Sequence, residues 1–536
     1  MSLLNLIWQK FSPREKKFFL ISVSLIIFTC IVLVFIFIQE NSVLENIGGG
    51  IYKEGVIGQP ININPILSNN PTDQKISSLV FAPLSSLLKN LIVSNDGKVY
   101  TLELDDKLKW SDGEPLNSDD IIFTLQTIQD TNAHSPLYSS WQGVSWERIS
   151  AIQVKIYLPN TNFLFQKNIE NLQIIPKHIL GVIPVENMAL SEYKLEPVGS
   201  GPYKFLNFSK RKDGFITSYT LIKNNYSNQN PLIKKIEFVF FENEKDVNQA
   251  LLTHQINGFG FFNQSAEINP NLLKGYNLQK IYTTTYYAAL FNMTNPILKN
   301  INIRKALVLS ANLPEINKKV LDNNGLLISG PVLNLQNTTS STFNLPLAQS
   351  LISQWKAKNK NLSLNLNLVV PNVDFLKKIA EELKNNWETA GIDNVNILPF
   401  NFNSTEENSI LKTKNYDVLI LGNTPLNSDD LFVFWHSSQI NYPGLNLSSY
   451  TNTQADNLLE KIRQTEDSNT RNQLLANFQN ILANDYPAVF LFRLPYFYIY
   501  SKNLDATFPS SIITPQDIYQ NINNWSIVTV RVLKFK

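Results

Sequence analysis

Cysteine is nearly absent from this sequence of 536 residues, in which Cys30 is the single one. It lies inside an uncharged apolar run at residues 18–38. The rest of the chain therefore has no disulfide, no thiol nucleophile and no cysteine-based metal site.

Histidine is also scarce, and the residues present are His134, His178, His254 and His436. No two of them have a metal-ligand spacing such as His-x-x-x-His. The sequence lacks a Gly-x-Ser-x-Gly elbow, a phosphate-binding Gly-x-x-x-x-Gly-Lys and a Gly-x-Gly-x-x-Gly. We therefore expect no metal, no cofactor and no enzyme, although a catalytic triad set by geometry leaves no such motif.

Net charge is small as well. The 46 basic and 44 acidic residues leave a formal charge of +2, which gives no electrostatic drive toward nucleic acid. Hydrophobic residues make up 43% of the sequence, too large a share for a disordered chain. The length exceeds one ordinary core, so we expect two or three lobes.

The apolar run at residues 18–38, "FFLISVSLIIFTCIVLVFIFI", is the clearest feature near the start of the chain. A helix of roughly 20 such residues spans the bilayer core. Basic residues precede the run and acidic residues follow it, namely Lys10, Arg14, Lys16 and Lys17, then Glu40 and Glu45. This bias predicts a single-pass membrane anchor with residues 1–17 in the cytoplasm and the main domain outside.

A cleaved signal peptide is the alternative for this run. Its apolar region would be shorter and followed by small residues, whereas this run ends in Phe, Ile, Phe, Ile and Gln. A lipoprotein signal would need small residues before Cys30, which "IIFTCIVL" does not supply. We therefore favour an uncleaved anchor, followed by a polar linker at residues 39–50 that ends in glycines.

The remaining chain alternates strand and helix patterns. Residues 99–104 and 152–158 alternate as half-buried strands do, and residues 233–241 become solidly apolar. A helix is predicted at residues 373–390, because one apolar stripe runs through it and Gly391 follows as a cap; the stripe comprises Leu376, Ile379, Ala380, Leu383 and Trp387.

Two further amphipathic helices are predicted near the C-terminus, at residues 455–464 and 470–485. Pro487 ends the second helix, and "AVFLF" then reads as a buried strand. This mixture of strand and helix patterns along the chain indicates an α/β fold with lobes around a cleft.

The stretch "LKWSDGEPLNSDDIIFTL", residues 108–125, gathers several carboxylates. An EF-hand loop is excluded, because setting Gly113 at its sixth position puts apolar residues where ligands belong. A carboxylate pair for glycoside chemistry is possible in principle. We favour a turn at "SDGEP", with Gly113 free to take positive φ, and then a helix whose N-cap is Asn117, with Asp120 reaching back in a capping box.

Six segments, in chain order, resemble the extracytoplasmic solute-binding proteins of peptide-type ABC transporters, the oligopeptide/dipeptide/nickel-binding class known as family 5. They are "EGVIGQPININPIL", "YTLELDDKLKWSDGEPLNSDDIIFTL", "PVGSGPYKF", "VNQALLTHQING", "LFNMTNPILKNINIRKALVLSAN" and the block at residues 444–492. Ser200 stands where the family has Thr, and His254 and Asn257 replace its usual Gly and Asp.

The resemblance implies a two-lobed periplasmic-binding-protein-like fold (class II, cluster C type) with an inserted sub-domain, preceded by the transmembrane helix at residues 18–38. Crossing strands would join the lobes, which close on a solute. Lobe I would comprise residues 51–75, 192–285 and 501–536, the inserted sub-domain residues 76–191, and lobe II residues 286–500.

Peptide-binding members of the family hold the ligand's free amine with an Asp of the last lobe. The run "NSDDLFVFWHSSQ" resembles that region, which implies Asp430 as the amine contact, with Trp435 and His436 in the wall. The alternative is that Asp429 or Asp430 caps a helix and Trp435 is core. No Arg occurs in residues 305–462, so an arginine clamp for a ligand carboxylate cannot come from that stretch.

The leading functional hypothesis is a membrane-anchored protein that captures peptides or similar small solutes and delivers them to an ABC permease. It would work as a monomer, with the solute and the permease as its partners, and would catalyse no reaction. The alternative is a tethered cell-envelope hydrolase or assembly factor that reuses the fold.

Overall fold

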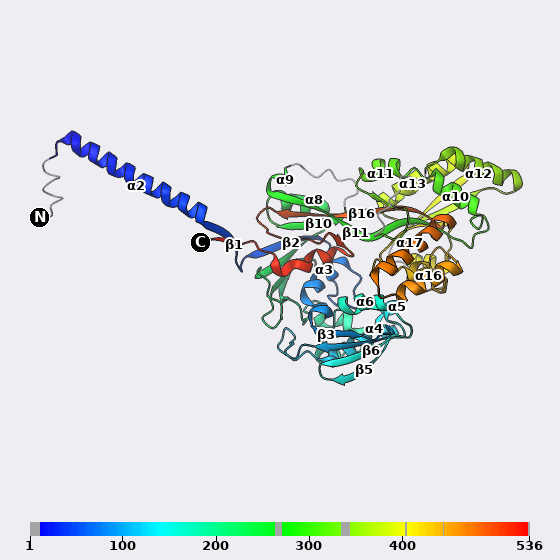
Figure 1. The fold of residues 1–536 in the computed structure, drawn as a ribbon, viewed down its shortest axis with the longest axis horizontal. Coiled ribbons are helices and arrows are strands. Elements are labelled where there is room, and N and C mark those ends of the chain that lie inside the picture. The colour runs from blue at the N-terminus through cyan, green and yellow to red at the C-terminus, as the bar shows by residue number, and fades with distance from the viewer. Residues whose placement is uncertain (1–10, 263–270, 334–342, 402–404, 443, 534–536) are drawn as a thin grey trace.

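Helix α2, Pro13–Asn41, extends away from the body of the protein (Figure 1). The computed structural model describes residues 11–262, 271–333, 343–401, 405–442 and 444–533. A capping box starts the helix, because the Ser12 N–H donates to Glu15 Oε2 at 2.8 Å and the Glu15 N–H donates to Ser12 Oγ at 3.4 Å. The stretch Pro13–Phe37 is long and apolar enough to cross a membrane, and the protein itself buries none of it.

The segment after the helix differs from the plain linker predicted at residues 39–50. Helix α2 runs to Asn41, and strand β1, Ser42–Asn46, follows at once. It pairs antiparallel with the last strand, β18, Thr529–Leu533, so the C-terminus lies beside the base of the helix (Figure 1). Pairing between the two ends of a chain leaves no local sequence pattern, which is why the sequence did not indicate it.

One 12-stranded sheet runs through the body. Its main path, in spatial order, is β14 (Asn394–Phe400), β13 (Asn365–Pro371), β15 (Val418–Asn423), β11 (Tyr276–Phe291), β16 (Ala488–Ser501), β10 (Gly258–Phe262), β2 (Ile51–Ile57), β9 (Lys235–Phe241), β8 (Ile216–Lys223) and β7 (Tyr203–Lys210). The short strands β12 (Leu326–Leu327) and β17 (Ser511–Ile512) pair with β16 and β11.

Strands β11 and β16 are the longest, with 16 and 14 residues, and pair antiparallel along most of their length. Each therefore belongs to both halves of the sheet: one half contains β13, β14 and β15, and the other contains β2, β7, β8, β9 and β10. They are the crossing strands that the resemblance implies. We propose that the lobes meet at the predicted boundaries. One lies between residues 285 and 286, within β11, and the other between residues 500 and 501, at the end of β16.

Helices cover both faces of the half that contains β13 to β15. Along β11, Ala289 and Phe291 pack on one side while Ala288 and Leu290 pack on the other, as the pleat of a strand requires. The first face is covered by α10 (Ile301–Ser310), α11 (Leu313–Leu321), α12 (Leu345–Lys358) and α13 (Asp374–Ala390); the second by α15 (Phe432–Trp435), α16 (Thr453–Gln464) and α17 (Ser468–Asp485). Helix α14 (Thr405–Thr413) precedes β15.

The predicted helices are confirmed. In α13 every residue of the predicted apolar stripe is buried, and Gly391 caps the helix with a φ of 113°. Helices α16 and α17 contain the two predicted C-terminal segments. The predicted strand "AVFLF" begins β16, which runs on to Ser501 because its later residues are buried as well.

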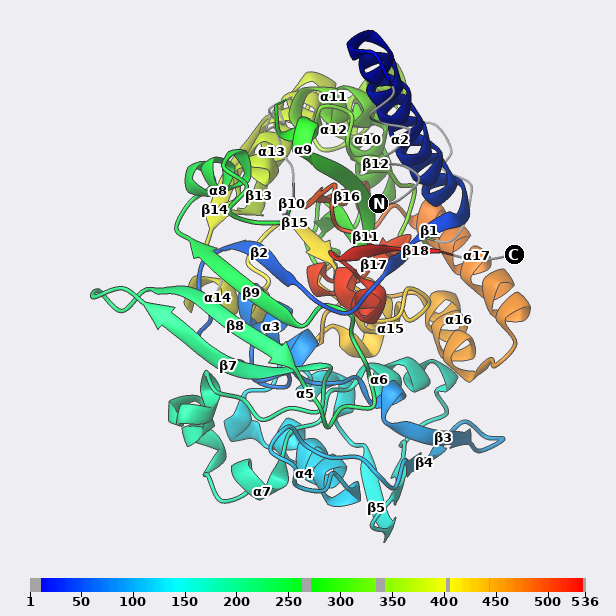
Figure 2. The ribbon, with the colours of Figure 1, turned by 90° about the vertical axis from the view of Figure 1, so that its left-hand side faces the viewer.

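A separate four-stranded sheet forms the core of the region predicted as an insertion (Figures 1 and 2). Its order is β3 (Leu88–Val93), β4 (Val99–Leu104), β6 (Gln153–Tyr157) and β5 (Ser145–Ser150), with α4 (Ser118–Gln129) packed against it. The remaining short helices, some within this region and some outside it, are α3 (Pro71–Val80), α5 (Tyr138–Trp141), α6 (Gln166–Asn171), α7 (Lys177–Leu180), α8 (Glu244–Leu252) and α9 (Leu272–Gly275). We propose to keep residues 76–191 as the insertion.

The acid-rich stretch at residues 108–125 is a turn followed by a helix start, as predicted. Gly113 has a φ of 101°. Asn117 and Asp120 form the capping box of α4, and the backbone N–H of Asn117 donates to Asp120 Oδ2 at 2.9 Å. Asp120 also accepts from the indole of the buried Trp110 at 3.3 Å. Its burial raises the pKa of this carboxyl, and its oxygens serve the fold.

Two other family-like motifs also have structural roles. In "PVGSGPYKF", a Cβ on Gly199 would lie 2.0 Å from the Val80 carbonyl oxygen at the end of α3, so only glycine allows this close approach. In "NIRKAL", the buried Arg304 donates to the carbonyl oxygens of Leu298 and Asp485 at 2.8 and 2.7 Å. These motifs therefore hold chain segments together.

Candidate functional site

A cavity with a volume of about 460 Å³ lies at the edge of the parallel strands. Strand β13 pairs in parallel with both β14 and β15. Phe400 ends β14, Val373 follows β13, and Gly422 lies near the end of β15, and all three line the cavity. Ligands of open α/β sheets bind outside the carboxyl ends of parallel strands, so this cavity is the candidate site.

The cavity also touches the strands that cross between the halves of the sheet. Phe262 of β10 and Leu494 of β16 line it, with Thr285 and Tyr287 of β11. The other lining residues come from α13, α14, β15 and the position directly after β15: Phe375, Leu376, Leu411, Leu421 and Thr424. The site thus lies where lobe II meets the crossing strands.

The chemistry of the lining is apolar and aromatic. Among the described residues that line the cavity, none carries a charge. Its side-chain polar groups are hydroxyls: Thr285 and Thr424 are hydrogen-bonded to each other at 2.8 Å, and Tyr287 adds a phenol. Burial raises the pKa of Tyr287 to about 12, so its hydroxyl remains neutral.

The shape of the cavity depends on a glycine. A Cβ on Gly422 would lie 3.0 Å from the Tyr287 ring and 3.1 Å from the Thr285 methyl group. The Tyr287 ring in turn packs edge-on against Phe375, with centroids 5.6 Å apart. Gly422 therefore leaves room for the aromatic wall.

The three residues predicted to bind ligand lie elsewhere, in and after the loop that follows β15. None of Asp430, Trp435 and His436 lines the cavity. Asp430 is in a two-pronged ion pair with Arg463 of α16, at 2.8 and 2.9 Å, and its neighbour Asp429 pairs with Arg471 of α17 at 3.1 Å. The two pairs tie the loop to the helices.

Trp435 and His436 pack into the surroundings of that loop. Trp435 is fully buried and donates from its indole to the Tyr286 hydroxyl at 3.1 Å. The His436 ring stacks on Phe432 with centroids 4.0 Å apart, and the Arg463 guanidinium also lies over Phe432, at 3.9 Å. Trp435 is thus a core residue, and Asp430 is held by an ion pair and not as the cap of the following helix. Contact of Asp430, Trp435 and His436 with a ligand stays a prediction.

A buried polar cluster lies in the other half of the sheet. The Glu54 carboxylate of β2 accepts from Tyr52 at 3.0 Å and from Tyr498 at 2.7 Å, and Lys75 of α3 lies 3.7 Å from it. Burial would lower the pKa of Lys75, but its attraction to the Tyr496 oxygen and to Glu54 outweighs that effect and raises this pKa. A Cβ on Gly258 would lie 1.8 Å from the Tyr52 hydroxyl, so glycine makes room for the cluster.

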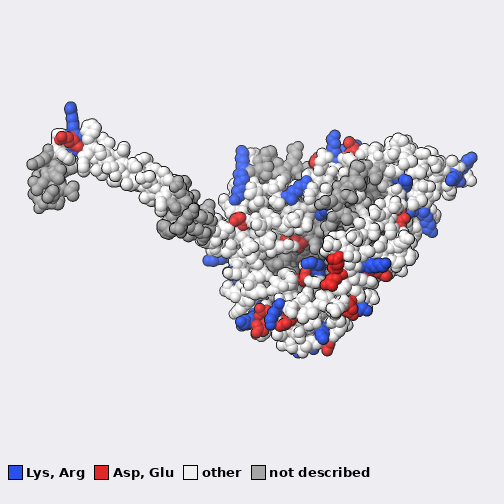
Figure 3. Space-filling model, viewed as in Figure 1, with Lys and Arg blue, Asp and Glu red and all other residues white. Residues whose placement is uncertain are grey.

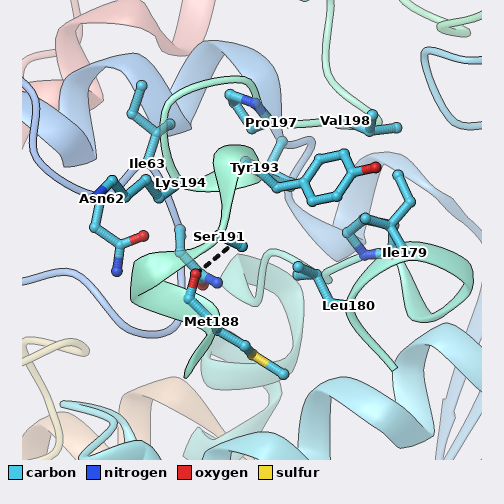
Figure 4. A pocket seen from close by; sticks show the side chains of 13 residues that line it. Asn62, Ile63, Ile179, Leu180, Met188, Ser191, Tyr193, Lys194, Pro197 and Val198 are labelled. Atoms are coloured by element: carbon cyan, nitrogen blue, oxygen red, sulfur yellow. Dashed lines mark hydrogen bonds between the residues drawn. The ribbon is translucent and has the colours of Figure 1, made fainter. Parts of the chain in front are cut away.

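The other features of the described residues are a small pocket and scattered surface charges. A pocket of about 20 Å³ between loops of residues 62–64 and 188–198 has room for about one water molecule (Figure 4). No group of His, Cys, Asp and Glu among the described residues is placed to hold a metal ion. On the face shown in Figure 3, basic and acidic side chains are interspersed, without a broad patch of one sign.

Sequence reasoning missed the aromatic residues of the cavity, such as Phe375 and Phe400. A signal for them existed, because they stand at the start of a helix and at the end of a strand. Residues at the carboxyl ends of parallel strands gather at one edge. That rule requires the strand order, which the sequence alone does not supply.

Known proteins resemble this chain along nearly its whole length. The Bacillus subtilis oligopeptide-binding protein AppA is 24% identical over 532 aligned residues, covering 89% of this chain and 91% of AppA. The AppA structure in complex with a nonapeptide has a TM-score of 0.72 and 20% identity, covering 90% of this chain and 100% of that one.

Two other solved structures share the fold. The ABC transporter substrate-binding protein CtaP from Listeria monocytogenes has a TM-score of 0.73 and 24% identity, covering 89% of this chain and 99% of CtaP. NikZ from Campylobacter jejuni, in complex with Ni(L-His), has a TM-score of 0.68 and 22% identity, with 89% and 99% covered.

The family model that matches describes the middle region of the bacterial extracellular solute-binding proteins, family 5, and covers residues 83–442. This range includes the inserted sheet, the crossing strand β11 and the loop of Asp430. The resemblance inferred from short motifs is thereby confirmed. The chain belongs to the bacterial extracellular solute-binding proteins, family 5.

Proposed function

We propose that this protein captures peptides outside the cell and delivers them to an ABC permease in the membrane. The observation that carries the proposal is the match to an oligopeptide-binding relative along 89% of the chain. The cavity at the crossing strands supports it, because a volume of about 460 Å³ suits a small ligand or part of a larger one.

The proposed mechanism is closure of the two lobes. The lobes are joined by the long strands β11 and β16, and the cavity lies beside them. A ligand that contacts both lobes binds the closed form better than the open one and shifts the equilibrium by that difference in affinity. The permease would then recognise the closed form.

The proposed location is the outer face of the cell membrane, with α2 as an uncleaved single-pass anchor. Apolar side chains such as Phe18 and Phe28 are 73% and 67% exposed on this helix, and lipid would cover them. The basic residues before the run favour a cytoplasmic N-terminus. Proteolysis of intact cells tests this: a protease added outside should remove the main domain.

We propose that the protein is a monomer without catalytic activity. The family consists of solute-binding proteins, and the described residues of the cavity lining offer hydroxyls but no acidic or basic side chain. A tethered hydrolase or assembly factor has no specific observation in its favour. Asp430, Trp435 and His436 stay predictions as ligand contacts.

Native mass spectrometry of the full chain in detergent tests the proposed function. Capture of peptides should appear as a ladder of bound masses that disappears after unfolding and returns when peptides are added back. A diverse peptide library that neither adds mass nor raises the melting temperature would refute peptide capture.

A further inference from the structure

The chemistry of the cavity specifies which part of a ligand it takes. Resting on the proposed function, we propose that the cavity receives one aromatic or branched apolar side chain of the bound peptide, and that the peptide's charged groups remain outside it. The uncharged aromatic lining at the ends of β13 to β15 carries this inference.

Burying a charged group in this cavity would cost free energy. The described residues of the lining offer no charged partner to a ligand ammonium or carboxylate. A charged group moved from water into such surroundings loses its hydration without compensation. An apolar group gains there instead, because its burial removes apolar surface from water.

The two acids of the loop that follows β15 are already engaged in ion pairs. Asp429 and Asp430 are held by Arg471 and Arg463 at 3.1 and 2.8 Å. Recruiting either acid into the cavity would leave an arginine without its partner, which is costly for a half-buried charge. The loop therefore supplies no carboxylate for a basic side chain.

The shape of the cavity and the hydroxyl of Tyr287 also suit an apolar side chain. Gly422 keeps space in front of the Tyr287 ring, and Tyr287 meets Phe375 edge-on. A ligand ring can add to this pair in the same geometry, which aromatic groups prefer. No described residue makes a hydrogen bond with the Tyr287 hydroxyl, so this neutral phenol is available to a peptide N–H or C=O.

Four pentapeptides that differ at one position test the inference: Ala-Ala-X-Ala-Ala with Phe, Leu, Lys or Glu as X. Binding is measured by titration calorimetry on the full chain in lipid nanodiscs. The Phe and Leu peptides should bind at least about tenfold more tightly than the Lys and Glu peptides. Gly422→Leu, which fills the cavity, should abolish this preference, whereas Leu362→Phe on the exposed surface should preserve it.

A charge placed in the cavity makes a second, independent test. Thr424→Asp should reverse the order and make the Lys peptide the tightest binder, while Thr413→Asp at the exposed end of α14 should leave the order unchanged. Equal affinities for the four peptides, or an unchanged order in Thr424→Asp, would overturn the inference and leave peptide capture standing. Failure of all four peptides and of a diverse library would overturn both.

Discussion

The guanidinium of Arg463 donates to both carboxylate oxygens of Asp430, at 2.8 and 2.9 Å. The same guanidinium lies over the Phe432 ring at 3.9 Å. Asp430 is therefore fixed by its own lobe, at the position where the family resemblance implies a contact to a ligand amine. The two roles make different predictions.

Asp430→Asn separates those roles. A structural role predicts a loss of about 1–3 kcal/mol in the free energy of unfolding, because Arg463 loses its partner. It also predicts the same small change in affinity for free-amine and N-acetylated peptides, and this is the outcome we expect. A loss of about tenfold or more for free-amine peptides alone would instead establish Asp430 as a ligand contact.

The buried pair Glu54 and Lys75 gives a prediction on stability. Lys75→Met should lower the free energy of unfolding by about 3–5 kcal/mol, because it leaves the Glu54 carboxylate buried without its cation. The double variant Lys75→Met with Glu54→Gln should recover part of that loss. Chemical denaturation of all four forms completes the cycle, and strictly additive losses would show that the pair is not coupled.

Lys414 predicts a dependence of stability on pH. Its ammonium donates to the Asn446 carbonyl at 2.7 Å and to Ser449 Oγ at 2.9 Å, and burial lowers its pKa to about 8. The unfolded chain holds this proton up to the ordinary pKa of 10.5, so stability should rise between pH 8 and 10.5.

The reference for that measurement is Lys414→Met, which has no proton to lose. The difference in unfolding free energy between the natural chain and this variant should increase across the interval by roughly 1 kcal/mol, a figure reduced because the half-exposed group is screened by solvent. A flat difference would show that Lys414 titrates as an ordinary lysine.

The capping box of α4 gives a local prediction. Asn117→Ala should cost about 1 kcal/mol of stability, because it removes the acceptor for the first turn of the helix. Asn117→Ser keeps an acceptor and should cost only a few tenths of that amount. An equal loss in both variants would show that the effect does not come from the cap.

Local patterns in the sequence predicted local structure well. The stripe of α13 ending at Gly391, the turn at Gly113 and the cap at Asn117 each depend on residues within a few positions of one another. Burial periodicity and capping are governed by such neighbours. These elements were therefore accessible from residues alone.

Contacts between distant segments were not accessible in the same way. The pairing of β1 with β18 joins the two ends of the chain, and Arg463 lies 33 positions after its partner Asp430. The cavity gathers residues from Phe262 to Leu494. Only the strand order brings these residues together. The family and the predicted lobe II were therefore accessible from the sequence, whereas the residues that line the cavity were not.

If peptide binding closes the lobes, the distance between them must shorten, and this distance can be measured directly. Leu190→Cys and Leu362→Cys, both exposed, would carry labels on the predicted inserted sub-domain and on predicted lobe II, with Cys30→Ser removing the native thiol. Addition of the Phe-containing pentapeptide to the full chain in nanodiscs should raise energy transfer between the labels in a saturable manner. Energy transfer that stays constant while a diverse peptide library is added would contradict the account.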